Sequence, residues 1–253
     1  MSKSILGVVF AFLYAPIVVL VVMSFNASDS PYALDGVSTR WYAELVGDEQ
    51  IRKGLINTLI VATGSTALAA VFGTLLAVGL ARYTRSRALD ALALAPAVLP
   101  DIVLAIGLLA FWSLLQATLG LHSVLLAHLL FGTAFVTAVV RARLHQVDGS
   151  LEEASRDLGA GPVTTFLRIT LPSLGPGIAA GSLLAFTLSI DEFVIAFFTA
   201  GPDQPTLPIV IYSMMRFGVT PEINALATVL LAVSFTVVLA AQRMSRLTDS
   251  LGR

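Results

Sequence analysis

Cysteine is absent from the 253 residues, and charged residues make up only 12% of them. Without cysteine the chain has no disulfide framework, no thiolate metal site and no cysteine nucleophile. Its three histidines, His122, His128 and His145, form no HExxH pattern and have no i,i+4 partner, so we expect no metal site. The formal net charge of −1 argues against binding of nucleic acid.

Two catalytic motifs are also missing. No GxxxxGK[ST] loop is present to hold nucleotide phosphates, so any use of ATP would need another polypeptide. No GxSxG elbow is present either, and a serine–histidine pair inside a membrane would have only His128 as its base. An intramembrane hydrolase therefore stays open only as a rival without a visible nucleophile–base pair.

Apolar residues dominate instead: they make up 57% of the chain and give a mean hydropathy of +0.88. A run of about 20 apolar residues is long enough to cross a bilayer as a helix. We predict an all-α membrane protein with one domain, residues 1–253, and six transmembrane helices. The predicted spans are about 5–23, 55–81, 89–116, 124–140, 177–199 and 223–241.

Three details bear on these spans. The first could instead be a cleaved signal peptide with Lys3 at its charged end, but the run contains Pro16 and lacks a small-residue cleavage site. The third is interrupted by Pro96 and Pro100, which free backbone groups that must be satisfied elsewhere. Between the first two spans, the aromatic residues of segment 39–42 predict an interfacial helix. Small residues in the second span favour close helix packing: Gly64, Ser65, Ala69, Ala70 and Gly73.

The distribution of positive charge predicts the orientation. If the N-terminus is cytoplasmic, all but four of the 15 Lys and Arg residues fall in cytoplasmic segments. The four exceptions are Arg40, Arg52, Lys53 and Arg216. Because cytoplasmic loops carry an excess of Lys and Arg, we expect both termini and the segment that follows the fourth span to be cytoplasmic.

Acidic residues inside predicted spans indicate a pathway or helix contacts. An acid at the bilayer centre costs about 2.5–3.5 kcal/mol, so such residues usually face a bundle interior or a watery cavity. On a continuous fifth helix, Asp191 and Phe198 would share a face, and Glu192 would point about 100° away. We predict a substrate pathway lined by Asp101, Asp191 and Glu192, with Trp112 or Phe198 offering a ring to a cation. Alternatively, the carboxylates join helices, and Glu192 could face a partner chain.

A polar segment with strong helix signals follows the fourth span. Ser150-x-x-Glu153 fits a capping box that starts a short helix. Gly159 stands where a left-handed residue would end that helix. Pro162 suits the first position of a second helix, which we expect to end at Pro172. The segment therefore predicts two short helices joined by a tight turn.

Residues 150–172 resemble the EAA loop of ABC-importer permeases. The matching positions are Glu153, Ala154, Ser155, Gly159, Ile169, Leu171 and Pro172. Ser155, in place of a second alanine, is the one departure. The resemblance implies that these residues form a coupling helix that docks in a groove of an ATPase subunit. The alternative is an ordinary helix–turn–helix linker between two spans.

Further stretches resemble the C-type permease of bacterial spermidine/putrescine importers. They include Ser24-Phe25-Asn26, Thr39-Arg40-Trp41-Tyr42, Pro100-Asp101-Ile102-Val103, Gly201-Pro202, Ile211-Tyr212-Ser213-Met214 and the segment 218–228. The resemblance implies a type I ABC importer permease fold in the bacterial cytoplasmic membrane. The implied partners are a second related permease, two ATPase subunits, a periplasmic substrate-binding protein and membrane lipid. The chain itself would bind no cofactor, since ATP and Mg would be bound by the ATPase.

The resulting functional prediction is a permease subunit of a binding-protein-dependent importer for spermidine, putrescine or a similar small organic cation. One alternative is an importer permease for another small solute, such as an amino-acid derivative or another amine. The other is a stand-alone secondary transporter or channel, which would transport without ATP.

Overall fold

The computed structural model describes residues 3–29, 33–84, 86–216, 218 and 220–251, without the side chains of residues 3, 4 and 237–251. Regular structure in these residues is helical apart from one isolated β-bridge between Asn26 and Val37, which confirms the predicted all-α class. Arg85 and Arg253, two basic residues behind the predicted orientation, lie outside the described residues. The helices are α1 (Lys3–Met23), α2 (Arg40–Gly47), α3 (Glu49–Arg82), α4 (Arg87–Leu94), η1 (Ala95–Ala97), α5 (Asp101–Leu114), α6 (Leu121–Leu144), α7 (Ser150–Asp157), α8 (Pro162–Thr165), η2 (Phe166–Thr170), α9 (Leu171–Asp191), α10 (Val194–Thr199), α11 (Leu207–Met215) and α12 (Pro221–Leu251).

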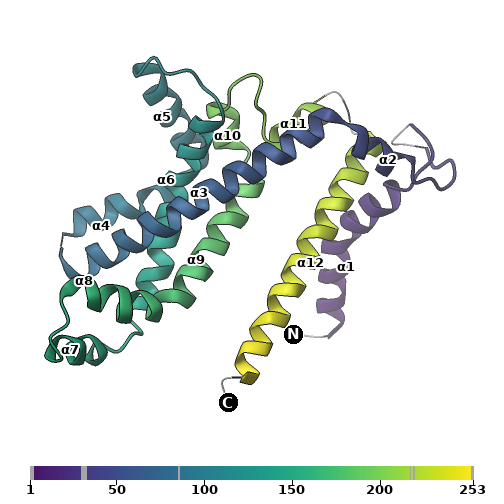
Figure 1. Ribbon diagram of the computed structural model, residues 1–253. Helices are drawn as coiled ribbons and strands as arrows, with labels where there is room; N and C mark the ends of the chain where they lie inside the picture. Colours follow the sequence, from purple (N-terminus) through teal and green to yellow (C-terminus); the bar gives the residue numbers. More distant parts are fainter. Residues whose placement is uncertain (1–2, 30–32, 85, 217, 219, 252–253) are drawn as a thin grey trace. The chain divides into compact units, whose positions relative to one another are not determined.

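The chain divides into two compact units, residues 1–52 with 210–253, and residues 53–209. In the first unit α12 contacts both α1 and α2 (Figure 1). Every side chain from Ile5 to Val19 in α1 is exposed although the helix is almost wholly apolar. A helix that is apolar on all sides is typical of one surrounded by lipid or by other helices.

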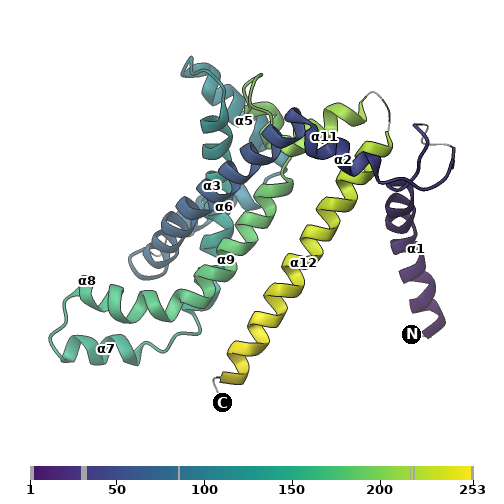
Figure 2. The ribbon, with the colours of Figure 1, turned by 45° about the vertical axis from the view of Figure 1, so that its right-hand side comes forward.

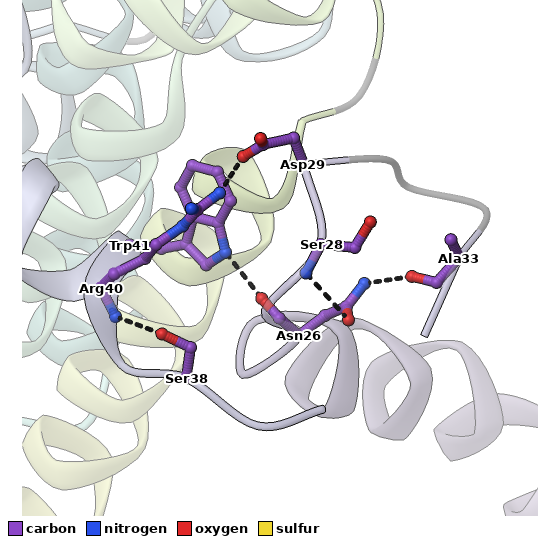
Figure 3. Close-up of polar contacts among 7 residues, drawn as sticks. All are labelled: Asn26, Ser28, Asp29, Ala33, Ser38, Arg40 and Trp41. Carbon is purple, nitrogen blue, oxygen red and sulfur yellow. Dashed lines mark hydrogen bonds and ion pairs between the residues drawn. The ribbon is translucent and has the colours of Figure 1, made fainter. Parts of the chain in front are cut away.

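The side chain of Asn26 holds the segment that follows α1 (Figure 3). Asn26 is buried, and its Nδ2 donates to the carbonyl of Ala33 at 2.5 Å. The indole Nε1 of Trp41 donates to the backbone carbonyl of Asn26 at 2.8 Å, and Arg40 lies over the same ring at 4.1 Å while it pairs with Asp29. These contacts fix the start of α2, the helix that the aromatic residues of segment 39–42 predicted.

In the second unit α6 packs against both α3 and α9. Gly73 permits the approach of α3, because a Cβ there would lie 2.7 Å from the Cβ of Val136. Thr137 donates through Oγ1 to the carbonyl of Gly73 at 3.2 Å, a bond that needs the same closeness. In α9, Gly181 would place a Cβ 3.2 Å from the Cα of the same Val136. The small residues in the second predicted span therefore act as expected.

Among the described residues, four helices are long and apolar enough to cross a membrane: Ile5–Met23, Glu49–Arg82, Leu121–Leu144 and Pro162–Asp191. The pair Arg87–Ala97 and Asp101–Leu114 would make a fifth span if it is counted as one. The helical segment Pro221–Thr236 is apolar but shorter. The count of six spans and the side on which the termini lie stay predictions.

Two predicted spans are not single helices. The interruption predicted at Pro96 and Pro100 in the span 89–116 is confirmed, because the chain bends by 100° between η1 and α5. The prediction of one continuous helix over residues 177–199 was wrong. There α9 begins earlier, at Leu171, and ends at Asp191, and α10 starts separately at Val194.

Candidate functional site

The hairpin predicted over residues 150–172 forms in the second unit, but its first helix, α7, is capped differently. The N–H of Ser150 donates to Asp148 Oδ1 at 2.9 Å, and its hydroxyl donates to Oδ2 at 2.8 Å. These bonds, the backbone bond first, lower the pKa of the Asp148 carboxyl. The predicted capping box with Glu153 was therefore wrong, because the Asp148 carboxylate takes both donors of Ser150.

The turn after α7 confirms the prediction for Gly159. Its φ is +84°, in the left-handed region. The N–H of Gly159 donates to the carbonyl of Arg156 at 2.9 Å, and the N–H of Ala160 donates to that of Ser155 at 3.1 Å. This pair of bonds is the Schellman motif, which satisfies carbonyls at the end of a helix.

The second arm of the hairpin does not end at Pro172. It starts with Pro162 as predicted, continues from α8 through the π-helical turn η2, and joins α9 directly (Figure 2). Pro172 lies in the first turn of α9, where the change of hydrogen-bond register leaves room for a residue without an N–H. The hairpin is thus continuous with the long helix that leads to Asp191.

The inner face of α7 is tied to the second unit through Glu152. Its side chain is only 9% exposed. Arg82, the last residue of α3, donates to Glu152 Oε1, and Thr170 donates through Oγ1 to the same oxygen at 2.6 Å. One turn further along α7, the hydroxyl of Ser155 lies 3.1 Å from that of Thr165. The departure from the EAA pattern at Ser155 therefore makes a hydrogen bond between the two arms.

The outer face of α7 is free of such contacts with the rest of the described chain. Glu153 and Ala154 are exposed, and the side chain of Leu158 is 89% exposed. Of the other predicted coupling residues, Gly159 and Pro172 are exposed and Ile169 and Leu171 are half-buried. A surface of this kind, with one carboxylate among small and apolar residues, can dock against another chain.

A cavity of about 460 Å³ lies at the other end of α9. Three of the five residues predicted for the substrate pathway line it: Asp101, Asp191 and Glu192. The apolar part of its wall includes the rings of Phe131, Phe135 and Phe193. Asp101 and Asp191 are both exposed within the described chain, so their carboxylates are accessible to a ligand.

Glu192 has a second role, because its carboxylate starts α10. The N–H groups of Ile195 and Ala196 donate to its two oxygens at 2.8 and 2.9 Å. Nε2 of the buried His128 lies 3.5 Å from Glu192 Oε2, and Nδ1 of the same ring lies 2.6 Å from the hydroxyl of Ser189. The sequence predicted that Asp191 and Phe198 share one face of a continuous helix. That prediction was wrong, because the helix breaks at Glu192 between them.

Trp112 and Phe198 do not line this cavity. Trp112 is buried, and its ring lies 5.4 Å from that of Phe111 and 6.3 Å from that of His122. Phe198 packs against the apolar cluster that includes Phe131. Their contribution to a substrate pathway stays a prediction.

Sequence reasoning missed Glu152, Arg82, Thr170 and the contact of His128 with Ser189 and Glu192. Glu152 precedes the EAA positions and looks like a surface residue of a polar helix. Its partners come from other segments, so no local pattern could indicate the burial.

Comparison with known proteins decides what kind of protein presents these features. Residues 69–248 match the family described as "Binding-protein-dependent transport system inner membrane component". The chain belongs to this family. This membership confirms the resemblance to ABC-importer permeases that the EAA positions suggested.

The permease has close relatives in bacteria. It is 44% identical to the "Putrescine transport system permease protein PotI" of Escherichia coli (strain K12) over 231 residues, which are 88% of this chain and 82% of the relative. It is 40% identical to the "Spermidine/putrescine transport system permease protein PotC" of the same organism over 241 residues, 94% of this chain and 91% of the relative.

Solved structures share the fold. A chain of a bacterial ABC transporter involved in the import of the acidic polysaccharide alginate superposes with a TM-score of 0.75 at 14% identity, covering 96% of the permease and 98% of that chain. A chain of the MetNI methionine ABC transporter, inward facing, gives a TM-score of 0.59 at 20% identity, covering 76% and 93%. The predicted type I importer permease fold is confirmed.

The permease is thus the multi-pass, inner-membrane subunit of a bacterial ABC importer. As a permease subunit it does not hydrolyse ATP, which in ABC transporters is done by separate ATPase subunits.

Proposed function

We propose that the permease forms part of the translocation pathway for polyamines such as putrescine and spermidine, or for another small organic cation. The observation that carries this proposal is the placement of Asp101, from α5, and Asp191, from α9, on one cavity with aromatic walls. Two carboxylates match the separated ammonium groups of a polyamine, and aromatic rings attract cations and cover methylene groups. The names of the two Escherichia coli relatives support the same substrate class.

The complete importer, in this proposal, contains a second related permease, two ATPase subunits that bind ATP and Mg, and a periplasmic substrate-binding protein. The hairpin and both termini are cytoplasmic, as the distribution of Lys and Arg predicts. Closure of the ATPase dimer on ATP moves the hairpins together and opens the cavity between the permeases outward. After ATP hydrolysis the cavity between the permeases opens toward the cytoplasm and releases the cation there.

The hairpin provides the contact with the ATPase. Glu153 and Ala154 lie on the exposed face of α7, and Gly159 fixes the turn that presents this face. Ile169, Leu171 and Pro172 belong to the continuous arm that joins the hairpin to α9. A movement of the ATPase groove would therefore reach α9 without a flexible linker in between.

Uptake of radiolabelled putrescine and spermidine into liposomes tests this function. The liposomes contain the permease with its second permease and ATPase, and the binding protein is added outside. We expect ATP-dependent uptake that Asp191→Asn lowers about tenfold at low substrate concentration, because a hydrogen bond to a charged group contributes about 1.5–3 kcal/mol. Asp203→Asn is the matched control, since Asp203 is exposed in the same unit and does not line the cavity.

Three results would contradict the proposal in different ways. Uptake by the permease alone without ATP would favour a stand-alone transporter. Uptake of another solute but of neither polyamine would leave the importer and remove the substrate class. A loss of complex yield with Asp191→Asn that matches the loss of uptake would mean that Asp191 joins helices and does not bind the cation.

A further inference from the structure

Two neighbouring glutamates of α7 lie in opposite environments. The side chain of Glu152 is 9% exposed, whereas Glu153 is exposed and its side chain makes no hydrogen bond or ion pair with the described residues. Residues three apart share a helix face, so Glu152 and Ser155 both point inward and Glu153 points away. Only Glu153 belongs to the EAA positions that the family resemblance marks.

Three elements meet at one oxygen of Glu152. Oε1 accepts from Arg82, at the end of α3, and from Thr170 at 2.6 Å, at the end of η2. Thr170 directly precedes α9, which runs without interruption to Asp191 at the cavity. Through this carboxylate, α7 is therefore joined to α3 and to the helix that carries a cavity residue.

A hollow borders α7 on this side. Its volume is about 310 Å³, and its wall includes Leu144, Val147 and Gly149 as well as Arg82 and Glu152. Beyond the Glu152 contacts, a side-chain hydrogen bond between the hydroxyls of Ser155 and Thr165 joins the two arms. Loss of the Glu152 contacts would leave this bond and the turn to hold α7.

Glu152 is ionised in this arrangement. Burial by itself raises the pKa of Glu152, but the hydrogen bonds from Arg82 and Thr170, with the charges of Arg82 and Arg156, outweigh it and leave the pKa of the carboxyl lowered. A buried ion pair of this kind tolerates poorly the loss of one partner, because the other charge then stays uncompensated.

We propose that Glu152 is a positioning residue that transmits movement of the hairpin to α3 and α9, while Glu153 provides the contact with the partner chain. The inference rests on the proposed import function for its transport readout. It assigns the two acids separate roles: the outer one receives the force and the inner one passes it into the membrane helices. Nothing in the EAA pattern distinguishes these roles.

The test uses the assembled importer in liposomes with the binding protein and radiolabelled putrescine. Three quantities are measured for each variant: complex yield, ATPase rate and putrescine imported per ATP hydrolysed. We expect Glu152→Gln to keep the ATPase bound and active but to lower the import per ATP by about fivefold or more, the usual size of a coupling between sites. Asp157→Asn, an exposed acid on the same helix, is the matched control and should change none of the three.

An exchange of charges separates transmission from folding. Glu152→Arg combined with Arg82→Glu restores an ion pair at the same place and should recover at least half of the lost import per ATP. Thr170→Val removes one donor at nearly constant shape and should have a smaller effect in the same direction. If import per ATP is unchanged in Glu152→Gln, or if uptake and ATPase fall only in proportion to complex yield in every variant, the proposal is overturned.

Hydrogen exchange distinguishes failure of this inference from failure of the proposed function. Glu152→Gln should increase exchange in α7 and at the end of α3, and Asp157→Asn in neither, whatever the importer transports. A wild-type complex that imports no putrescine would remove the substrate class and leave this result standing. Unchanged exchange in both segments would overturn the role of Glu152 even in a complex that imports polyamines.

Discussion

Replacing Gly159 by alanine isolates the contribution of one backbone angle to the hairpin. Gly159 has φ +84°, and Gly161, two residues later, has φ −71°. A Cβ at either position would meet no atom within 4 Å, so the two substitutions do not differ in steric contacts. The left-handed conformation costs an L-residue roughly 1–2 kcal/mol, whereas alanine at a compatible φ stabilises by about 0.4–1 kcal/mol through the unfolded chain. The two variants should therefore change stability in opposite directions.

Hydrogen exchange at the turn measures this difference. The amides of residues 159 and 160 donate the two Schellman bonds, so they report whether the turn is formed. A loss of 1–2 kcal/mol corresponds to about a 5–30-fold decrease in their protection in Gly159→Ala. Gly161→Ala should leave the protection unchanged or raise it.

Transport should depend on the conformation of the turn at Gly159. Gly159→Val, which adds a β-branched side chain at positive φ, should distort the exposed face of α7 and abolish putrescine uptake while the ATPase loses its response to the binding protein. Equal protection in Gly159→Ala and Gly161→Ala would refute the backbone argument. Full uptake in Gly159→Val would refute the role of the hairpin in coupling.

Three further predictions concern packing, the helix break and pH. Gly73→Ala should destabilise the protein by about 1–3 kcal/mol, because its Cβ would lie 2.7 Å from that of Val136. Gly79→Ala in the same helix meets nothing within 4 Å and should stabilise by up to about 1 kcal/mol. Thermal unfolding in detergent measures both, and an equal shift of the two variants would contradict the packing argument. Glu192→Ala should cost about 0.5–2 kcal/mol by removing the cap of α10, seen as faster hydrogen exchange in α10, and unchanged exchange there would count against the cap. The pKa of Glu152 is lowered in the folded protein, so the stabilisation by its carboxylate should be present above the ordinary glutamate pKa of about 4.3 and lost as the pH falls through the lowered pKa. The stability advantage of wild type over Glu152→Gln should therefore persist at pH 7 and disappear in acid.

Local signals in the sequence predicted the parts of the hairpin that depend on local conformation. Gly159 and Pro162 lie where their backbone preferences place them, since no distant residue is needed to satisfy either. The capping box failed because Asp148, two residues before Ser150, offered a charged acceptor to the same donors. Pro172 failed as a stop signal because the π-turn before it lets the helix continue without its N–H.

The interruptions within the predicted spans depend on contacts that a hydropathy pattern does not contain. Pro96 and Pro100 indicated a disturbance in the third span, but not a bend of 100°. In the fifth span no proline or glycine marks the break. Glu192 follows the last residue of α9, and its carboxylate caps α10 and lies beside the buried His128, a residue of another helix. An acid inside an apolar run was a sign of function, and here it also lies at the helix break and caps the next helix.

The assignment of the coupling residues shows the same division. The spacing of the EAA positions identified Glu153, which the structure leaves exposed and available to a partner. It could not identify Glu152, because Arg82 lies 70 positions and Thr170 lies 18 positions away in the sequence. A docking surface alone would let α7 move against the membrane helices without moving them. The buried carboxylate removes that freedom, so the efficiency of transport should depend on a glutamate that the motif does not include.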